Sequence, residues 1–163
     1  MSAIDDVLAN NAAFAAAYED RDPPRPPRRR LAVVACMDSR LDIYRMLGLA
    51  EGEAHVIRNA GGVVTQDTIR SLVVSQRIGG TREVMLMHNT ECGMLTFRDA
   101  ELRRRVESET GAEVPFAFQA FSDLEEQVRR SVARIRESPL LVHRDAVRGF
   151  VYEVRTGRLR EVR

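Results

Sequence analysis

The sequence predicts an α/β fold in which a mainly parallel β-sheet is flanked by helices. Two observations predict it: three short, largely apolar runs within residues 31–87 resemble buried strands, and segments of helical periodicity separate them. Short strands that alternate with helices form parallel sheets, because a parallel pair needs a long crossover connection. With 163 residues, the chain is expected to form a single domain, residues 1–163.

An N-terminal helix and a proline-rich arm, together residues 1–30, precede the first strand. Residues 5–18 place four large apolar side chains among alanines, which favours a helix with a modest apolar stripe. Four prolines within residues 22–27 cannot continue a helix and favour extended backbone. The arm either packs on another subunit or is a simple surface linker.

The central segments alternate strands with helices that end at glycine, a residue that readily adopts the left-handed backbone found after a helix. The predicted elements are, in order, a strand over residues 31–35, a helix over 41–47 closed by Gly48, a strand over 53–58, a helix over 65–78 ended by Gly79-Gly80, and a strand over 83–87.

The C-terminal half is predicted to be more helical. Residues 99–110 and 122–137 both carry helical spacing and dense charge, and Ser122 with Glu125 fits a capping box at the start of the second helix. Two extended segments then flank Thr156-Gly157, which predicts a hairpin at the edge of the sheet.

Composition excludes several classes of function. The 25 basic residues, all arginine, balance 24 acidic ones, so a general nucleic-acid binder is not expected. No apolar run reaches the roughly 18–20 residues of a membrane span, so no membrane partner is expected either. The N-terminus lacks the pattern of a secretory signal, which predicts a cytoplasmic protein whose Cys36 and Cys92 stay reduced.

The unusual polar residues follow the three predicted parallel strands. Cys36, Asp38 and Arg40 come after the first strand, and His88 and Cys92 after the third. Because ligands bind beyond the carboxyl ends of the strands in open α/β sheets, these residues are expected to share one crevice. Thiolate and imidazole are preferred zinc ligands, and three protein ligands leave the open fourth position of a catalytic site.

These motifs resemble those of the β-class carbonic anhydrases. Cys36, Asp38 and Arg40 match the family's Cys-x-Asp-x-Arg motif, an Arg-Asn-Ala-Gly run occupies residues 58–61, and Cys92 is followed by glycine. The resemblance extends over nearly the whole chain, and the combination of the three motifs is specific.

The resemblance implies both an activity and an assembly. It implies a β-carbonic-anhydrase-like fold, one Zn²⁺ per chain, and a zinc-dependent lyase that interconverts CO₂ and bicarbonate by zinc-hydroxide attack. It also implies a homodimer with sites at the subunit interface, so that the N-terminal helix and arm would cross to the partner.

The same resemblance assigns roles to individual residues. Asp38 and Arg40 would form a dyad that assists the reaction, while Arg58, Asn59 and Gly61 would shape the wall of the substrate pocket. The family also implies a switched-off form, in which the Asp leaves the Arg and closes the fourth position of the zinc.

One departure concerns the zinc ligands, because Asn89 stands where the family has its zinc histidine and His88 lies one residue earlier. Successive side chains of a strand point to opposite faces, so the two residues cannot simply exchange roles. Either a bulge aims His88 at the metal, which gives Cys36, Cys92 and His88 as ligands, or Asn89 faces the site and His88 lies behind it, bonded to backbone. In the second case the remaining candidate ligands are Cys36, Cys92 and Asp38.

Alternative functions follow from this departure. The chain could be a zinc hydrolase or lyase that acts on another small electrophile, or a metal-poor, non-catalytic homologue. A dithiol redox switch on Cys36 and Cys92 is the least favoured alternative, because the chain has no Cys-x-x-Cys arrangement.

Overall fold

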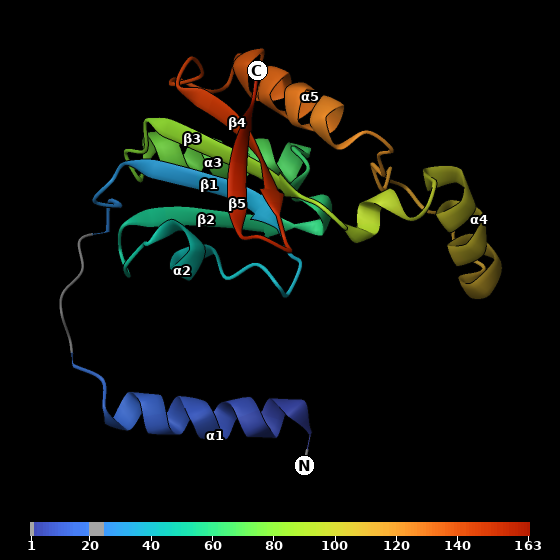
Figure 1. The fold of residues 1–163 in the computed structure, drawn as a ribbon. Coiled ribbons are helices and arrows are strands. Elements are labelled where there is room, and N and C mark those ends of the chain that lie inside the picture. The colour runs from blue at the N-terminus through green and yellow to red at the C-terminus, as the bar shows by residue number, and fades with distance from the viewer. Residues whose placement is uncertain (1, 20–24) are drawn as a thin grey trace.

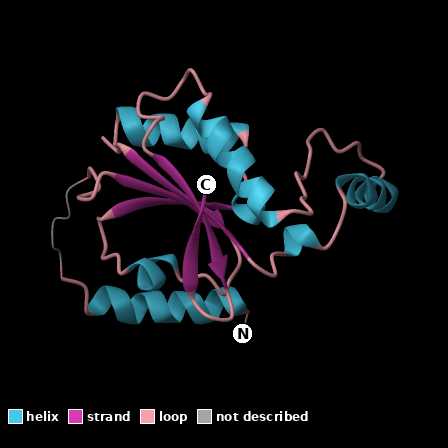
Figure 2. Cartoon of the chain, turned by 45° about the horizontal axis from the view of Figure 1, so that its top comes forward, coloured by secondary structure: helices cyan, strands magenta, loops and turns pink. Residues whose placement is uncertain are grey.

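The computed structural model describes residues 2–19 and 25–163; Pro23 and Pro24 of the predicted arm lie outside this part of the chain. Five strands form one sheet in the order β2-β1-β3-β4-β5. Figure 2 shows the strands gathered as one sheet between helices. Pairing is parallel from β2 through β4, and β5 runs antiparallel to β4, which confirms both the mainly parallel sheet and the edge hairpin. The strands are β1 (Leu31–Cys36), β2 (Ala54–Asn59), β3 (Glu83–Asn89), β4 (Val147–Glu153) and β5 (Arg158–Val162).

Helices connect and flank these strands (Figure 1). They are α1 (Ala3–Ala16), α2 (Ile43–Leu47), α3 (Gln66–Arg77), α4 (Asp99–Thr110) and α5 (Leu124–Arg136), with two 3-10 turns, η1 (Ala60–Gly62) and η2 (Gly93–Leu95).

The two faces of the sheet belong to two hydrophobic clusters, because successive side chains of each strand point to opposite sides. Val34 packs with Leu72 of α3 and Val128 of α5, whereas its neighbour Val33 belongs to the cluster that holds Ile43 of α2. Residues Ala32–Cys36 are all buried, as the continuous apolar run predicts for a central strand.

Local signals fix the ends of several helices. Gly48 adopts left-handed backbone (φ 62°) directly after α2, and Thr65 caps the N-terminus of α3. The capping residue of α5 is Asp123, whose side chain accepts from the backbone N–H of Glu126, so the box predicted at Ser122 is wrong by one residue.

Helix α1 is the least embedded element, since every one of its residues is exposed. Four of its apolar side chains, Ile4, Val7, Leu8 and Phe14, are 60–68% exposed, and Figure 1 draws the helix apart from the sheet. Within the described residues, no helix is both long enough and apolar enough to cross a bilayer.

Parallel pairing places the carboxyl ends of β1, β2 and β3 at one edge of the sheet. Cys36 at the end of β1 lies opposite Asn59 at the end of β2, and β3 continues past this level to Asn89. The loops that follow the three strands therefore meet at the position expected for a ligand site in an open α/β sheet.

Candidate active site

The two thiols lie together at this edge. Cys36 ends β1 and Cys92 directly precedes η2, and their Sγ atoms are 3.8 Å apart in a buried position. Two Zn–S bonds of about 2.3 Å at a tetrahedral angle place their sulfurs about 3.8 Å apart. The thiol pair therefore has the spacing that a shared zinc ion requires.

The environment of Cys36 favours its thiolate. The hydrogen bond from the Cys92 thiol lowers the pKa of Cys36, and the backbone N–H groups of Asp38 and Gly61 lower it further. The same sulfur–sulfur contact, with burial, raises the pKa of Cys92. The pair thus readily carries one negative charge, and a cation is needed to stabilise the second.

Asp38 and Arg40 form the predicted pair. The Nε atom of Arg40 donates to Oδ1 of Asp38 at 3.0 Å, and its Nη2 donates to Oδ2 at 2.6 Å, while the backbone N–H of Arg40 reaches Oδ1 at 3.0 Å. Chiefly because of the guanidinium, the pKa of Asp38 falls to about 2. Asp38 is therefore ionised at physiological pH.

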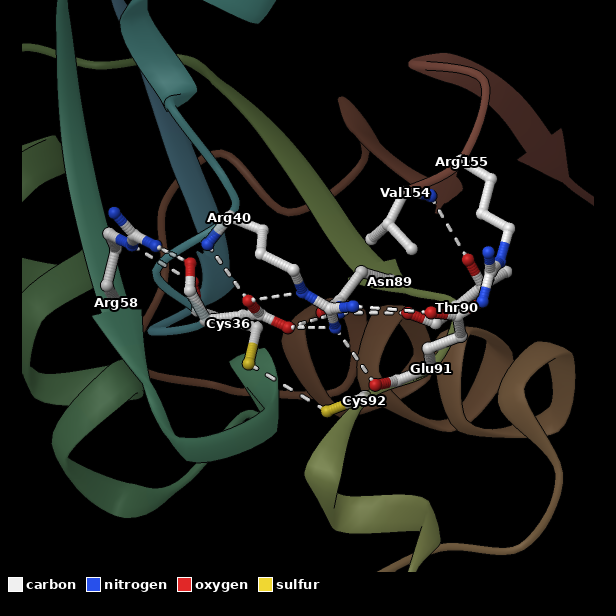
Figure 3. A network of polar contacts seen from close by, with 10 residues as sticks. Cys36, Arg40, Arg58, Asn89, Thr90, Glu91, Cys92, Val154 and Arg155 are labelled. Carbon is white, nitrogen blue, oxygen red and sulfur yellow. Dashed lines mark hydrogen bonds and ion pairs between the residues drawn. The ribbon is translucent and has the colours of Figure 1, made fainter.

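A second carboxylate holds the other side of Arg40 (Figure 3). Glu91 accepts from Arg40 Nη1 at 3.3 Å, and its backbone carbonyl accepts from Nη2 at 3.0 Å. Arg155 of the β4–β5 hairpin also pairs with Glu91, and the hydroxyl of Thr90 accepts from the backbone N–H of Val154. The hairpin is thus tied to the loop that carries Cys92.

Arg58, at the end of β2, holds the loop after β1. Its Nε donates to the carbonyl of Cys36 at 2.9 Å, and its Nη2 donates to the carbonyl of Asp38 at 2.7 Å. Asn59 donates from Nδ2 to the carbonyl of Val63 at 2.8 Å. The side chains of these two predicted pocket residues therefore position backbone around the thiol pair.

The glycines of η1 allow the closest approach of backbone in the site. Gly61 has φ +76°, and a Cβ atom there would lie 2.8 Å from Met94 Cγ. Gly62 has φ +67°, and its Cβ would lie 2.8 Å from the backbone N of Cys36. Both positions need glycine, because a side chain would meet its neighbours as well as left-handed strain.

Asn89 faces the Asp38–Arg40 pair. Its Nδ2 donates to Oδ2 of Asp38 and to the carbonyl of Thr90, each at 3.1 Å. Because both partners are acceptors, the nitrogen of the amide must occupy this position. Its Oδ1 is buried and has no hydrogen-bond partner.

His88 is not brought to the cysteines, so the predicted ligand set that includes it is wrong, and His88 lies behind the site as the second alternative expects. Its Nδ1 lies 2.6 Å from the carbonyl of Gly61, its Nε2 lies 3.1 Å from Oγ of Ser131, and the ring is fully buried beside Phe121. Burial lowers the pKa of His88 to about 4. Since β3 runs without interruption to Asn89, the alternation of side chains sends His88 behind the site.

The donors present fit zinc at two positions and depart from the predicted set at the third. Cys36 and Cys92 supply a thiolate pair at the right spacing, whereas the side chain that enters the site from the end of β3 is the amide of Asn89 and not the imidazole of His88. Among the described residues, no three histidine, cysteine, aspartate or glutamate side chains converge as a metal site. The Oδ1 atom of Asn89, which has no hydrogen-bond partner, is a neutral oxygen that could serve as a metal ligand.

Sequence reasoning did not single out Glu91, Arg155 or Ser131. Arg155 lies far from the site along the chain, and only pairing of β4 with β3 brings it to Glu91. The one available signal was Glu91 itself, a charged residue directly before Cys92.

Comparisons with known proteins give a consistent set of relatives. The model of the carbonic anhydrase family matches residues 31–112. Beta-carbonic anhydrase 1 of Mycobacterium tuberculosis strain H37Rv is 51% identical over 162 residues, which cover 99% of both chains. A carbon disulfide hydrolase of Acidianus sp. strain A1-3 is 35% identical, over 83% of this chain and 78% of that protein.

A solved structure shares the whole architecture. The crystal structure of carbonic anhydrase from Streptococcus mutans matches with a TM-score of 0.94 and 41% sequence identity, over 100% of this chain and 99% of that one. The likeness therefore includes the N-terminal helix as well as the sheet.

Proposed function

Because the chain belongs to the β-class carbonic anhydrase family, we propose that it interconverts CO₂ and bicarbonate with one Zn²⁺ held by Cys36 and Cys92. One observation carries the proposal: the Asp38–Arg40 pair is assembled beside two thiols whose sulfurs are 3.8 Å apart. When bound, zinc acts as a Lewis acid that lowers the pKa of water.

The residues of the chain orient the reactants. Asp38, ionised because Arg40 holds its pKa to about 2, serves as a hydrogen-bond acceptor for the reacting water rather than as its base. Water adds its oxygen to the carbon of CO₂, which gives bicarbonate and one proton, and the proton leaves to solvent. Arg58 keeps the loop of Cys36 and Asp38 in place through their carbonyls.

A second substrate has specific support. The carbon disulfide hydrolases among the relatives act, by their names, on CS₂, a linear molecule like CO₂. Zinc-dependent hydrolysis of CS₂ is therefore the second candidate function. A metal-poor, non-catalytic homologue is the third, and the position of His88 away from the thiols favours it.

Metal analysis followed by rapid kinetics tests these candidates. Protein purified without chelator after zinc-supplemented expression is expected to hold one zinc per chain, and Cys36→Ser to lose it. Ser39→Ala, at an exposed neighbouring position, is the matched control and should retain the metal. Stopped-flow assays with CO₂ and with CS₂ then identify the substrate. Absence of zinc from the wild-type protein would overturn the first two candidates.

We also propose a homodimer and a cytoplasmic location. The exposed apolar side chains of α1 need a partner surface, and a second copy of the chain supplies one if the arms cross. Both cysteines are free thiols, as is usual in the cytosol.

A further inference from the structure

We propose that Asn89 is a positioning residue that holds Asp38 on Arg40, and so keeps the Asp38 carboxylate out of the coordination of a metal ion on Cys36 and Cys92. This inference rests on the proposed function only for the metal. Its structural part concerns the contact between Asn89 and Asp38 and can be tested without zinc.

The acceptor positions of Asp38 are all filled. Oδ1 accepts from the backbone N–H and from Nε of Arg40, and Oδ2 accepts from Nη2 of Arg40 and from Nδ2 of Asn89. A carboxylate offers about four lone-pair sites. Moving Asp38 toward the thiol pair would therefore break four hydrogen bonds, and only three of them come from Arg40.

The fourth donor distinguishes this site from one that carries histidine at the same position. An imidazole bound to zinc has no N–H left on its metal-binding nitrogen, whereas the amide of Asn89 has two N–H groups and gives one to Asp38. The other N–H binds the carbonyl of Thr90, which fixes the rotation of the amide. Asn89 is itself fully buried, so its hydrogen bond to Asp38 is protected from competing solvent.

The surroundings of Arg40 favour the same orientation. Glu91 holds Arg40 through both its side chain and its backbone carbonyl, and Arg155 holds Glu91 in turn. The guanidinium therefore stays in place for Asp38. Of the four hydrogen bonds to Asp38, two come from the charged guanidinium and two from neutral donors, the backbone N–H of Arg40 and the amide of Asn89. The bond from Asn89 is the longest, at 3.1 Å, and it is the only one not made by Arg40, so the reacting water can replace it while Asp38 remains on Arg40.

Zinc affinity of the apoprotein, measured by competition with a chromophoric chelator, tests the inference. Asp38→Asn is made in the wild type and in Asn89→Leu, which keeps the size of the side chain but removes its donor. In the wild-type background, Asp38→Asn should weaken zinc binding by no more than about threefold. In the Asn89→Leu background Asp38 is released to the metal. The factor by which Asp38→Asn weakens zinc binding should therefore be at least about ten times larger there than in the wild-type background.

Equal effects of Asp38→Asn in the two backgrounds would contradict the inference. The control is Thr90→Val, which removes a neighbouring hydroxyl that binds Val154 rather than Asp38, and it should leave the wild-type pattern unchanged. Melting curves of each variant confirm that it is folded before titration.

If no variant binds zinc, the metal part of the proposed function fails, and unfolding of the metal-free protein decides the inference. The unfolding equilibrium constants of Asn89→Leu, Asp38→Asn and the double variant should then depart from multiplicative behaviour by at least about threefold, because the two single changes disturb the same hydrogen bond, one by removing its donor and the other by removing the charge of its acceptor. Multiplicative constants would show that Asn89 does not hold Asp38.

Discussion

Nδ1 of His88 donates a 2.6 Å hydrogen bond to the backbone carbonyl of Gly61. A carbonyl only accepts, so the proton of the neutral ring resides on Nδ1, and Nε2 accepts from the hydroxyl of Ser131. The histidine nearest in sequence to the cysteines thus supports the η1 turn that packs against β1, and it has no free nitrogen for a metal.

Acid should destabilise the protein through His88. Its pKa is 6.5 when unfolded and about 4 in the fold, because burial disfavours the charged ring. As pH falls from 6.5 to 4, the unfolded chain binds a proton that the folded one does not, so stability declines by up to about 3 kcal/mol. Above pH 6.5 this penalty is absent. The free energy of unfolding, measured with urea between pH 4.5 and 7.5, should fall with decreasing pH in the wild type and fall less in His88→Gln. Equal slopes in the two proteins would contradict this role of His88.

The carboxylate of Asp38 affects the stability of the fold at lower pH than His88 does. Its pKa is depressed below 3.8, so its contribution to stability is fully present above that value and is lost as pH falls toward 2. The two effects are therefore separable, since of these two groups only His88 changes the stability of the protein near pH 5.

Asn89→His should tighten zinc binding by at least about tenfold, because an imidazole is a far better zinc ligand than an amide. CO₂ hydration should rise with it. Chelator competition and stopped-flow kinetics measure the two effects. Unchanged affinity would mean that another donor already completes the metal site. Asn59→His, at the other asparagine of the site whose Oδ1 is buried without a hydrogen-bond partner, is the matched control and should not tighten binding.

Glu91→Gln should slow the reaction by about tenfold with little change in melting temperature, since it loosens Arg40 without touching the core. Both side chains of the pair with Arg155 are substantially exposed, so little stability is at stake. Glu161→Gln removes a comparable ion pair with Arg148 at the far side of the hairpin and should leave turnover unaltered. Equal turnover in the two variants would exclude a role for Glu91 in holding the dyad.

Gly62→Ala should destabilise the fold by more than about 2 kcal/mol, from left-handed strain plus contact of the new Cβ with the backbone of Ala35 and Cys36. Gly80→Ala carries similar strain, with φ +68°, but no atom lies within 4 Å of its Cβ, so it should cost about 1 kcal/mol. Urea unfolding gives both values. Similar losses at the two positions would show that the close approach at Gly62 is unimportant.

Charging the apolar stripe of α1 should dissociate the proposed dimer. Leu8→Glu with Phe14→Glu removes the exposed apolar side chains that would pack on a second copy, and light scattering should then give the mass of one chain. Asn10→Glu, at an exposed polar position of the same helix, is the control for added charge and should leave the mass doubled. A single-chain mass for the wild type would refute the proposal outright.

The positions of most strands and helices follow from local patterns. The apolar run of β1, the glycine after α2 and the alternation of strands with helices each specify an element within a residue or two of its observed bounds. The predicted start of α5 is one residue early because Ser122 and Asp123 are both good caps, and it is Asp123 whose side chain accepts from the backbone N–H of Glu126.

By itself the sequence determined the fold class, the sheet edge where Cys36, Asp38, Arg40 and Cys92 gather, and the substitution at residue 89. It left open which of two adjacent side chains enters the site. Tertiary structure decided this, because β3 stays regular to Asn89 and alternate residues of a strand face opposite sides. His88 then meets Gly61 and Ser131, while Asn89 meets Asp38; these partners come from distant parts of the chain, and only the assembled sheet and α5 bring them within hydrogen-bond distance.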